Sequence, residues 1–209
     1  MKILHQYLGL FMLLPFVAWA ITGVFFFVKP GYKEAYASLP IIAYPLMAQD
    51  QLKATLPSTS QWLEFRQIRT VLGVHLLVKD HDGWQQLKPL SFEALLKPSA
   101  EQVRALVKDA IATDPSRYGD IQSVNGLSVL TTNDIRISLN WEKLSLVQQG
   151  KDTDFINTMY DIHYLRWTGY QQVDQILGVV GLGLVIILAF LGVSMIFQRR
   201  KAQIDKRIK

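Results

Sequence analysis

The sequence predicts a membrane protein in which two transmembrane α-helices flank a small α+β domain. Two stretches, residues 3–28 and 176–197, contain no charged residue, and a helix of about 20 apolar residues crosses the ~30 Å hydrocarbon core of a bilayer. Between them, turn signals alternate with short apolar runs, a pattern typical of a small folded domain. Half of the 209 residues are hydrophobic, which is more than is usual for a soluble domain.

The first transmembrane helix is expected over residues 1–29. Its apolar run contains a small–x–small triplet at 18–20 that fits signal-peptide cleavage. The run continues for several residues past this triplet, and only Lys2 supplies positive charge before it. We therefore expect an uncleaved membrane anchor.

The second transmembrane helix is expected over residues 173–198, with a basic tail over 199–209. Basic residues beside a span mark its cytoplasmic side, so we expect both termini in the cytoplasm and residues 30–152 outside it. The net charge of +5 comes mainly from the tail and is interpreted as a topology signal, not as nucleic-acid binding. The basic residues of the tail are Arg199, Arg200, Lys201, Lys206, Arg207 and Lys209.

The first half of the domain at 30–152 is expected to contain a linker and a β-hairpin. Prolines punctuate residues 29–49 and leave this stretch little regular structure. A strand-like segment follows at about 62–68. Two further strand-like runs flank the sequence DHDG, in which Gly83 can adopt the positive φ of a tight turn.

The second half is expected to contain a helix followed by a meander of short strands. Ser99 and Gln102 have the spacing of a capping box, which predicts that a helix begins after Ser99. A second helix is expected over 153–172, and it carries His163 toward the second span. Apolar residues with helical period predict one buried face on the first helix: Val103, Leu106, Val107, Ala110 and Ile111.

The chain contains no cysteine and only four histidines. Disulfides, thiolate nucleophiles, iron–sulfur clusters and Cys-bound zinc are therefore excluded. Metal chemistry in this chain depends on His, Asp, Glu, Tyr or Met. No dinucleotide-binding glycine fingerprint occurs, so direct oxidation of NAD(P)H is not expected.

Two of the histidines fall within the domain. His75 lies in a strand-like run, where a packed structural histidine is expected. His81 stands between Asp80 and Asp82 at the predicted hairpin tip. One interpretation is a polar turn; the alternative is a weak iron site, because carboxylates and imidazole together suit iron ions.

The other two histidines lie beside the spans. His5 begins the first apolar stretch, where an ionisable group is a functional candidate, and Gly9, one turn later, leaves room for a flat group. His163 has Tyr160 one turn before it and Trp167 one turn after it. Neutral imidazole is an axial ligand of haem iron, so both histidines are candidate haem ligands. The alternatives are a histidine in the headgroup zone and a satisfied core histidine.

These two candidate ligands are expected near opposite faces of the membrane. One haem is far smaller than the ~30 Å slab, so His5 and His163 are not expected to share an iron within one chain. A symmetric dimer would let each histidine pair with its own copy and form two haem sites. The alternatives are a single site, or a His163 helix that folds back toward the bilayer.

Two membrane-flanking motifs resemble those of PepSY-associated transmembrane proteins. The first, LHQYLGLFMLLPFVAWAITG at 4–23, has a histidine at the cytoplasmic edge, a glycine four residues later and a Thr-Gly pair near the far end. The second, YDIHYLRWTGYQQVDQILGVVGLGL at 160–184, is similar to the closing segment of the family. The domain between them looks like a PepSY module, so the resemblance covers most of the chain.

The resemblance implies a haem b protein of the bacterial inner membrane with a periplasmic PepSY-like domain. Larger members include reductases of ferric siderophores with bis-histidine haems, and the short VciB-type members, the closest match, are implicated in dimeric, respiration-linked ferric reduction. By position, His5 and His163 would be axial ligands and Gly9 would pack on haem. The implied partners are a second copy of the chain, a quinol or respiratory-chain donor, ferric iron or a ferric chelate, and a ferrous transporter downstream.

Two other function classes were weighed against this one. PepSY modules also occur as inhibitory segments of peptidases, so the chain could anchor a periplasmic binding or inhibitor module that has no redox activity. A sensor is not expected, because the basic tail at 199–209 is too short for an output domain. A Soret band in the purified protein separates the reductase from the binding module.

Overall fold

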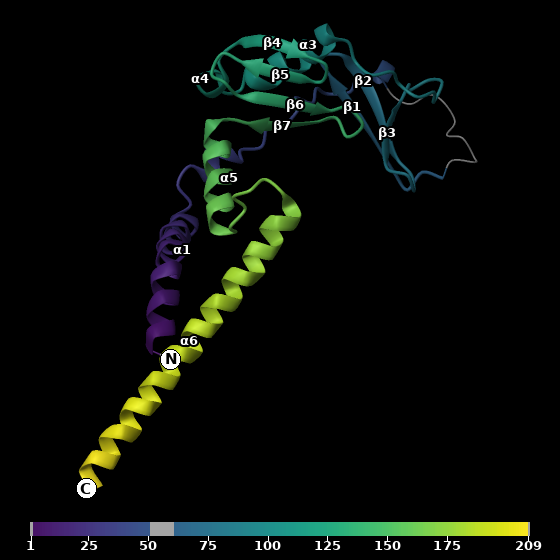
Figure 1. Ribbon diagram of the computed structural model, residues 1–209. Coiled ribbons are helices and arrows are strands. Elements are labelled where there is room, and N and C mark those ends of the chain that lie inside the picture. The colour runs from purple at the N-terminus through teal and green to yellow at the C-terminus, as the bar shows by residue number, and fades with distance from the viewer. Residues whose placement is uncertain (1, 51–60, 209) are drawn as a thin grey trace. The chain divides into compact units, whose positions relative to one another are not determined.

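The computed structural model describes residues 2–50 and 61–208 (Figure 1). The chain divides into two compact units. Met1–Gly31 and Phe155–Lys209 form the first, here called the membrane unit, and Tyr32–Asp154 form the second, here called the loop domain. The two apolar ends of the sequence therefore fold together, and the polar middle folds by itself.

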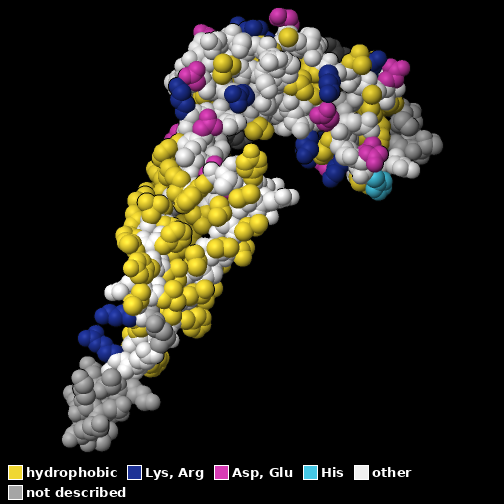
Figure 2. Space-filling model, viewed as in Figure 1, with side chains coloured by type: hydrophobic (Ala, Val, Ile, Leu, Met, Phe, Trp, Pro, Cys, Tyr) yellow, Lys and Arg dark blue, Asp and Glu magenta, His cyan; other side chains and the backbone are white. Residues whose placement is uncertain are grey.

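The membrane unit is built on the long helices α1 (Lys2–Val28) and α6 (Gln171–Ile208). Each contains a segment long and apolar enough to cross a membrane, Lys2–Val28 and Gln171–Arg200. Most of their large apolar side chains are exposed, and Figure 2 shows them as a broad hydrophobic surface over both helices. Lipid covers such a surface favourably, whereas water does not. The predicted pair of membrane helices flanking an α+β domain is confirmed.

Small residues let α1 and α6 approach each other near the N-terminal end of α1. A Cβ added to Gly9 would lie 4.0 Å from Leu188 Cδ2, and one added to Gly192 would lie 3.6 Å from His5 Cε1. Small residues at a helix contact allow membrane helices to pack closely. Met12 on α1 and Leu188 on α6 are both buried.

Helix α5 (Lys151–His163) ends well before residue 172, the end expected from the sequence. Leu165 and Gly169 have positive φ values of 55° and 74°, and such residues do not continue a right-handed helix. Leu165 is buried, and its Cδ1 would lie only 3.0 Å from a Cβ on Gly181 of α6. This packing holds the turn, so Trp167 lies outside the helix that carries His163.

The loop domain contains two antiparallel sheets with strand orders β1–β2–β3 and β4–β5–β6–β7. The predicted hairpin at DHDG is confirmed as β2–β3, and the predicted meander is confirmed as β4–β7. A tight turn at 71–72, which the sequence did not indicate, pairs β1 with β2. The strands are β1 (Glu64–Thr70), β2 (Gly73–Lys79), β3 (Trp84–Leu87), β4 (Ile121–Asn125), β5 (Ser128–Thr131), β6 (Arg136–Asn140) and β7 (Ser145–Gln149).

Helix α3 (Ala100–Ile111) begins and packs as its sequence predicts. Ser99 Oγ accepts from Gln102 N at 3.3 Å, and Gln102 Oε1 accepts from Ser99 N at 2.9 Å, which completes the capping box. All five predicted face positions are buried, in one cluster with residues of the β4–β7 sheet. The remaining short helices are α2 (Tyr32–Ala35), η1 (Ala48–Asp50) and α4 (Pro115–Tyr118).

Candidate functional site

His163 lies at the last position of α5 and packs against α1. Its imidazole meets the Phe26 ring edge-on, with 5.1 Å between centroids and 89° between planes. Tyr160 stacks on Phe26 from the preceding turn of α5, and Tyr164 meets the His163 ring edge-on at 5.3 Å. Aromatic rings in these geometries attract one another and restrict rotation of the imidazole.

A hydrogen bond joins His163 to Thr22 of α1 and orients the imidazole ring. Thr22 Oγ1 lies 2.7 Å from the Ala18 carbonyl and 2.8 Å from His163 Nδ1. A threonine hydroxyl has one hydrogen to donate and further lone pairs that accept. The helix carbonyl can only accept, and when Thr22 donates to Ala18 its oxygen can accept from a protonated His163 Nδ1.

With Nδ1 bound to Thr22, Nε2 is the ring nitrogen of His163 that can bind a metal ion. No described residue forms a hydrogen bond with this atom. Histidine ligands of metals commonly donate their other ring N–H to a partner that fixes the tautomer and raises ligand basicity. The contact between Nδ1 and Thr22 therefore gives His163 the hydrogen-bonded arrangement that is common among metal-binding histidines.

His5 lies in the first turns of α1 and differs from His163 in its surroundings. Its Nδ1 is buried, and no described residue hydrogen-bonds it. A buried polar atom without a partner costs free energy, so an unpaired ring nitrogen marks a place where a ligand would be favourable. Gly192 of α6 faces the ring. A Cβ added to Gly192 would lie 3.6 Å from His5 Cε1.

The membrane unit has one cavity of about 880 Å³ that His5 lines, and one of about 720 Å³ lined by Tyr164, the residue after His163. The cavity of 880 Å³ at the His5 end falls within the ~300–1,000 Å³ usual for cofactor sites. Met195 supplies a thioether there, and Lys2 and Arg199 supply two cations. The full lining is Lys2, His5, Gln6, Gly192, Met195, Ile196, Gln198 and Arg199.

These residues fit a haem. An imidazole and a thioether are both haem iron ligands, and two cations at the membrane edge suit the two carboxylates of the cofactor. The sequence alone indicates Gly192 as one of several small residues of the second span that suit helix packing or a haem face. Met195 was not predicted, and the available signal was its position three residues after Gly192, because residues i and i+3 share a helix face.

Gly9, expected to pack on a haem beside His5, faces α6 instead, with Leu188 Cδ2 at 4.0 Å from an added Cβ. It is not among the residues that line the cavity at His5. The glycine that borders the His5 ring is Gly192. In this structure Gly9 therefore contributes to the α1–α6 contact.

His5 lies near the start of α1, whereas His163 of α5 contacts α1 near the other end of that helix. From His5 to Thr22, which binds His163, the helix rises by about 25 Å at 1.5 Å per residue. The two imidazoles of one chain therefore do not meet at one iron, and each needs a second ligand of its own.

His75 is a satisfied structural histidine of the loop domain. Its side chain is buried, Nδ1 lies 2.8 Å from Gln86 Oε1, and Nε2 lies 2.8 Å from Thr70 Oγ1. Gln86 Nε2 donates to the Trp141 carbonyl, which turns Oε1 toward the histidine. Burial lowers the pKa of His75, and the hydrogen bond to Gln86 opposes this shift. The neutral ring joins β1, β2 and β3.

Asp80, His81 and Asp82 form the tip of the β2–β3 hairpin. Asp80 Oδ1 accepts from the backbone N–H groups of Asp82 and Gly83, at 2.9 and 3.0 Å, and Oδ2 accepts from Gln85 Nε2 at 2.7 Å. Within the described residues, no group of three or more His, Cys, Asp or Glu side chains converges as a metal site. The hydrogen bonds of Asp80 are those expected for a polar turn, the first of the two interpretations of this sequence.

Comparison with known proteins gives one match. The family model described as the PepSY-associated TM region matches residues 3–209. No curated protein and no solved structure matches the chain. The family match extends through both membrane helices and the whole loop domain.

Proposed function

Because the chain belongs to the family of PepSY-associated TM proteins, we propose that it is a haem b protein of the bacterial inner membrane that reduces ferric iron. Its electrons would come from the quinol pool or another respiratory donor. Its acceptor would be ferric iron or a ferric chelate in the periplasm, and the ferrous product would supply a ferrous transporter. In this proposal the loop domain is periplasmic and both termini are cytoplasmic.

The observation that supports this proposal best is the hydrogen bond from His163 Nδ1 to Thr22. It leaves Nε2 as the ring nitrogen that can bind iron. Phe26 and Tyr164 restrict the ring from two sides. The chain thus supplies an oriented ligand among aromatic rings. Haem iron bound there would alternate between ferric and ferrous states and carry one electron.

A homodimer would complete the coordination at the His163 end. Two copies related by a two-fold axis would bring two imidazoles to one iron, and a six-coordinate iron suits electron transfer because no position stays open. At the His5 end, the second ligand would be either His5 of a second copy or Met195 of the same cavity. Lys2 and Arg199 would pair with the cofactor carboxylates there.

An absorption spectrum of the purified full-length protein tests the proposal. We expect a Soret band that shifts on reduction with dithionite and returns when ferric citrate is added. His163→Ala should lower the haem content per chain, whereas His81→Ala, a matched change at an exposed turn, should leave it unchanged. A protein that stays colourless after haem supplementation would contradict the proposal and favour a membrane-anchored binding or inhibitor module.

A further inference from the structure

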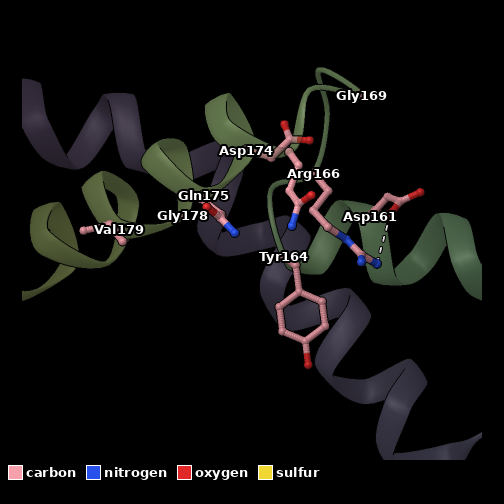
Figure 3. A pocket seen from close by; sticks show the side chains of 9 residues that line it. Asp161, Tyr164, Arg166, Gly169, Asp174, Gln175, Gly178 and Val179 are labelled. Carbon is pink, nitrogen blue, oxygen red and sulfur yellow. Dashed lines mark ion pairs between the residues drawn. The ribbon is translucent and has the colours of Figure 1, made fainter. Parts of the chain in front are cut away.

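A second cavity of the membrane unit, about 720 Å³ in volume, lies where the α5–α6 turn meets α6 (Figure 3). Residues from the end of α5, from the turn and from the first three turns of α6 surround it. The lining residues are Asp161, Tyr164, Arg166, Gly169, Gln171, Asp174, Gln175, Gly178 and Val179. None of them belongs to the cavity at His5.

The lining changes from polar to apolar along α6. Gln171 is the first residue of the helix, and Val179 lies about 12 Å further along its axis at 1.5 Å per residue. The polar lining therefore sits at the end of the membrane span, and Gly178 and Val179 lie inside it. A molecule that fills this cavity needs a polar head and an apolar body.

The charges of the cavity disfavour an anion. Arg166 is paired with Asp161 at 3.0 Å, and Asp174 adds a second carboxylate. Two carboxylates against one guanidinium leave net negative charge, which repels a phosphate group. The same groups suit an uncharged head that donates hydrogen bonds.

Asp174 is the polar group best placed to accept from such a head. It is only 8% exposed, and its Oδ1 accepts from Thr168 N at 3.0 Å and from Thr168 Oγ1 at 2.7 Å. These two bonds fix the carboxylate. No described residue hydrogen-bonds its other oxygen, which leaves that oxygen available to accept from a hydroxyl.

The cavity also borders the proposed haem ligand. Tyr164 lines the cavity, and its ring meets the His163 imidazole edge-on with 5.3 Å between centroids. An occupant of the cavity therefore contacts the residue that directly follows His163 in the chain.

From these features we propose that this cavity binds the head group of a membrane quinol. One quinol hydroxyl would donate to Asp174, and the apolar tail would follow Gly178 and Val179 toward the lipid. Gly178 lines the cavity without a side chain, and an added Cβ there would make only an ordinary 4.0 Å contact with the Tyr164 carbonyl oxygen. The role of a bound quinol as electron donor rests on the proposed function, whereas the inference itself concerns only quinol binding.

The experiment is photolabelling of the full-length protein in phosphatidylcholine nanodiscs with an azido-quinone, followed by mass spectrometry. We expect label within 161–179 and competition by a short-chain quinol. Gly178→Leu should weaken this competition about tenfold or more, because the side chain fills the cavity. Val180→Leu, a lipid-facing change two residues away, is the matched control and should leave it unchanged.

Asp174→Asn tests the role of the carboxylate without emptying the position. Asn can still accept from Thr168, but its NH₂ group donates where the carboxylate oxygen accepted. The preference should therefore shift by about tenfold from quinol, which donates, toward quinone, which accepts. An unchanged quinol-to-quinone ratio would overturn the assignment of Asp174.

The outcomes separate this inference from the proposed function. Label outside 161–179, or label that quinol does not displace, overturns the quinol site. Equal displacement by added phosphatidylethanolamine or phosphatidylglycerol overturns it in favour of a lipid headgroup site. Specific quinol binding by a protein without haem would support the site and contradict the reductase, whereas a haem protein without quinol binding would do the reverse.

Discussion

The two ends of α1 each present one histidine, and they differ in what surrounds the ring. At the His163 end, Thr22 binds one ring nitrogen and aromatic rings restrict the imidazole. At the His5 end, one ring nitrogen is buried without a partner among the described residues, and a larger cavity lies beside it. The first site is oriented by the protein itself, whereas the second depends on whatever fills it.

Because of this difference, we expect the two ends to have different roles in the proposed electron transfer. An oriented ligand changes little between redox states, which favours fast electron transfer. A site that depends on its occupant gains order only when the occupant binds. The cavity proposed for quinol adjoins the oriented end through Tyr164, so we expect the His163 end to dominate the proposed ferric reduction.

The largest effect is expected when the two histidines are replaced one at a time. His163→Ala should lower ferric reduction by more than the ~10–100-fold typical of losing an outer-shell partner, because the ligand itself is lost. His5→Ala should lower haem content but reduce the rate far less. The measurement is ferrous formation from ferric citrate in proteoliposomes supplied with quinol. An equal loss of rate in both variants would contradict a dominant His163 end and show that both histidines are needed.

A smaller effect is expected from Thr22→Val, which keeps the shape of the side chain and removes the hydroxyl. His163 Nδ1–H would then lose its acceptor, and haem affinity at this site should fall by about 10–100-fold. Haem titration of the apoprotein measures it. Thr22→Ser retains the hydroxyl and should restore affinity. No loss in Thr22→Val would mean that the aromatic rings alone orient the imidazole.

Gly192 and Gly9 allow a matched comparison at the His5 end. Gly192→Val would push methyl groups toward the His5 ring, where an added Cβ is already 3.6 Å from Cε1. We expect loss of the haem at His5 with the His163 site intact. Gly9→Ala meets only Leu188 at 4.0 Å, an ordinary contact, so its haem content should stay within about twofold of the unchanged protein. Difference spectra of the reduced proteins distinguish the two sites. A strong loss in Gly9→Ala would restore Gly9 as a haem contact.

The sequence predicted the local features of this molecule well, because local residues determine them. The Ser99 capping box, the hairpin at Gly83 and the two apolar spans all depend on neighbouring side chains. The end of α5 was not predicted, because it depends on Leu165 packing against Gly181, sixteen positions later in the chain. Non-local packing of this kind overrides local helix propensity.

The candidate sites show the same contrast between features set by nearby residues and features set by distant ones. The histidines could be selected from residue type and position alone. Their partners could not, since Thr22 lies 141 positions from His163 and Gly192 lies on the opposite helix from His5. Only the pairing of α1 with α5 and α6 brings these groups together.

The smallest effect concerns His75, a histidine that the loop domain satisfies on both ring nitrogens. Burial lowers its pKa below the ordinary value of 6.5. Below pH 6.5 the unfolded chain therefore binds more protons than the folded domain, so stability is fully present above that pH and is lost as the pH falls.

We expect the free energy of unfolding of the loop domain to drop by about 1 kcal/mol between pH 7.5 and 5, the scale of one buried hydrogen bond. Urea unfolding of the full-length protein, followed by tryptophan fluorescence, measures it. The Trp141 ring packs edge-on against His75 at 5.5 Å and reports on this region. His75→Gln should remove this part of the pH dependence. If the pH dependence is the same in His75→Gln, then other groups of the domain cause it. The hydrogen bonds of His75 would then not stabilise the domain measurably, and this histidine would no longer contrast in energy with the two membrane histidines.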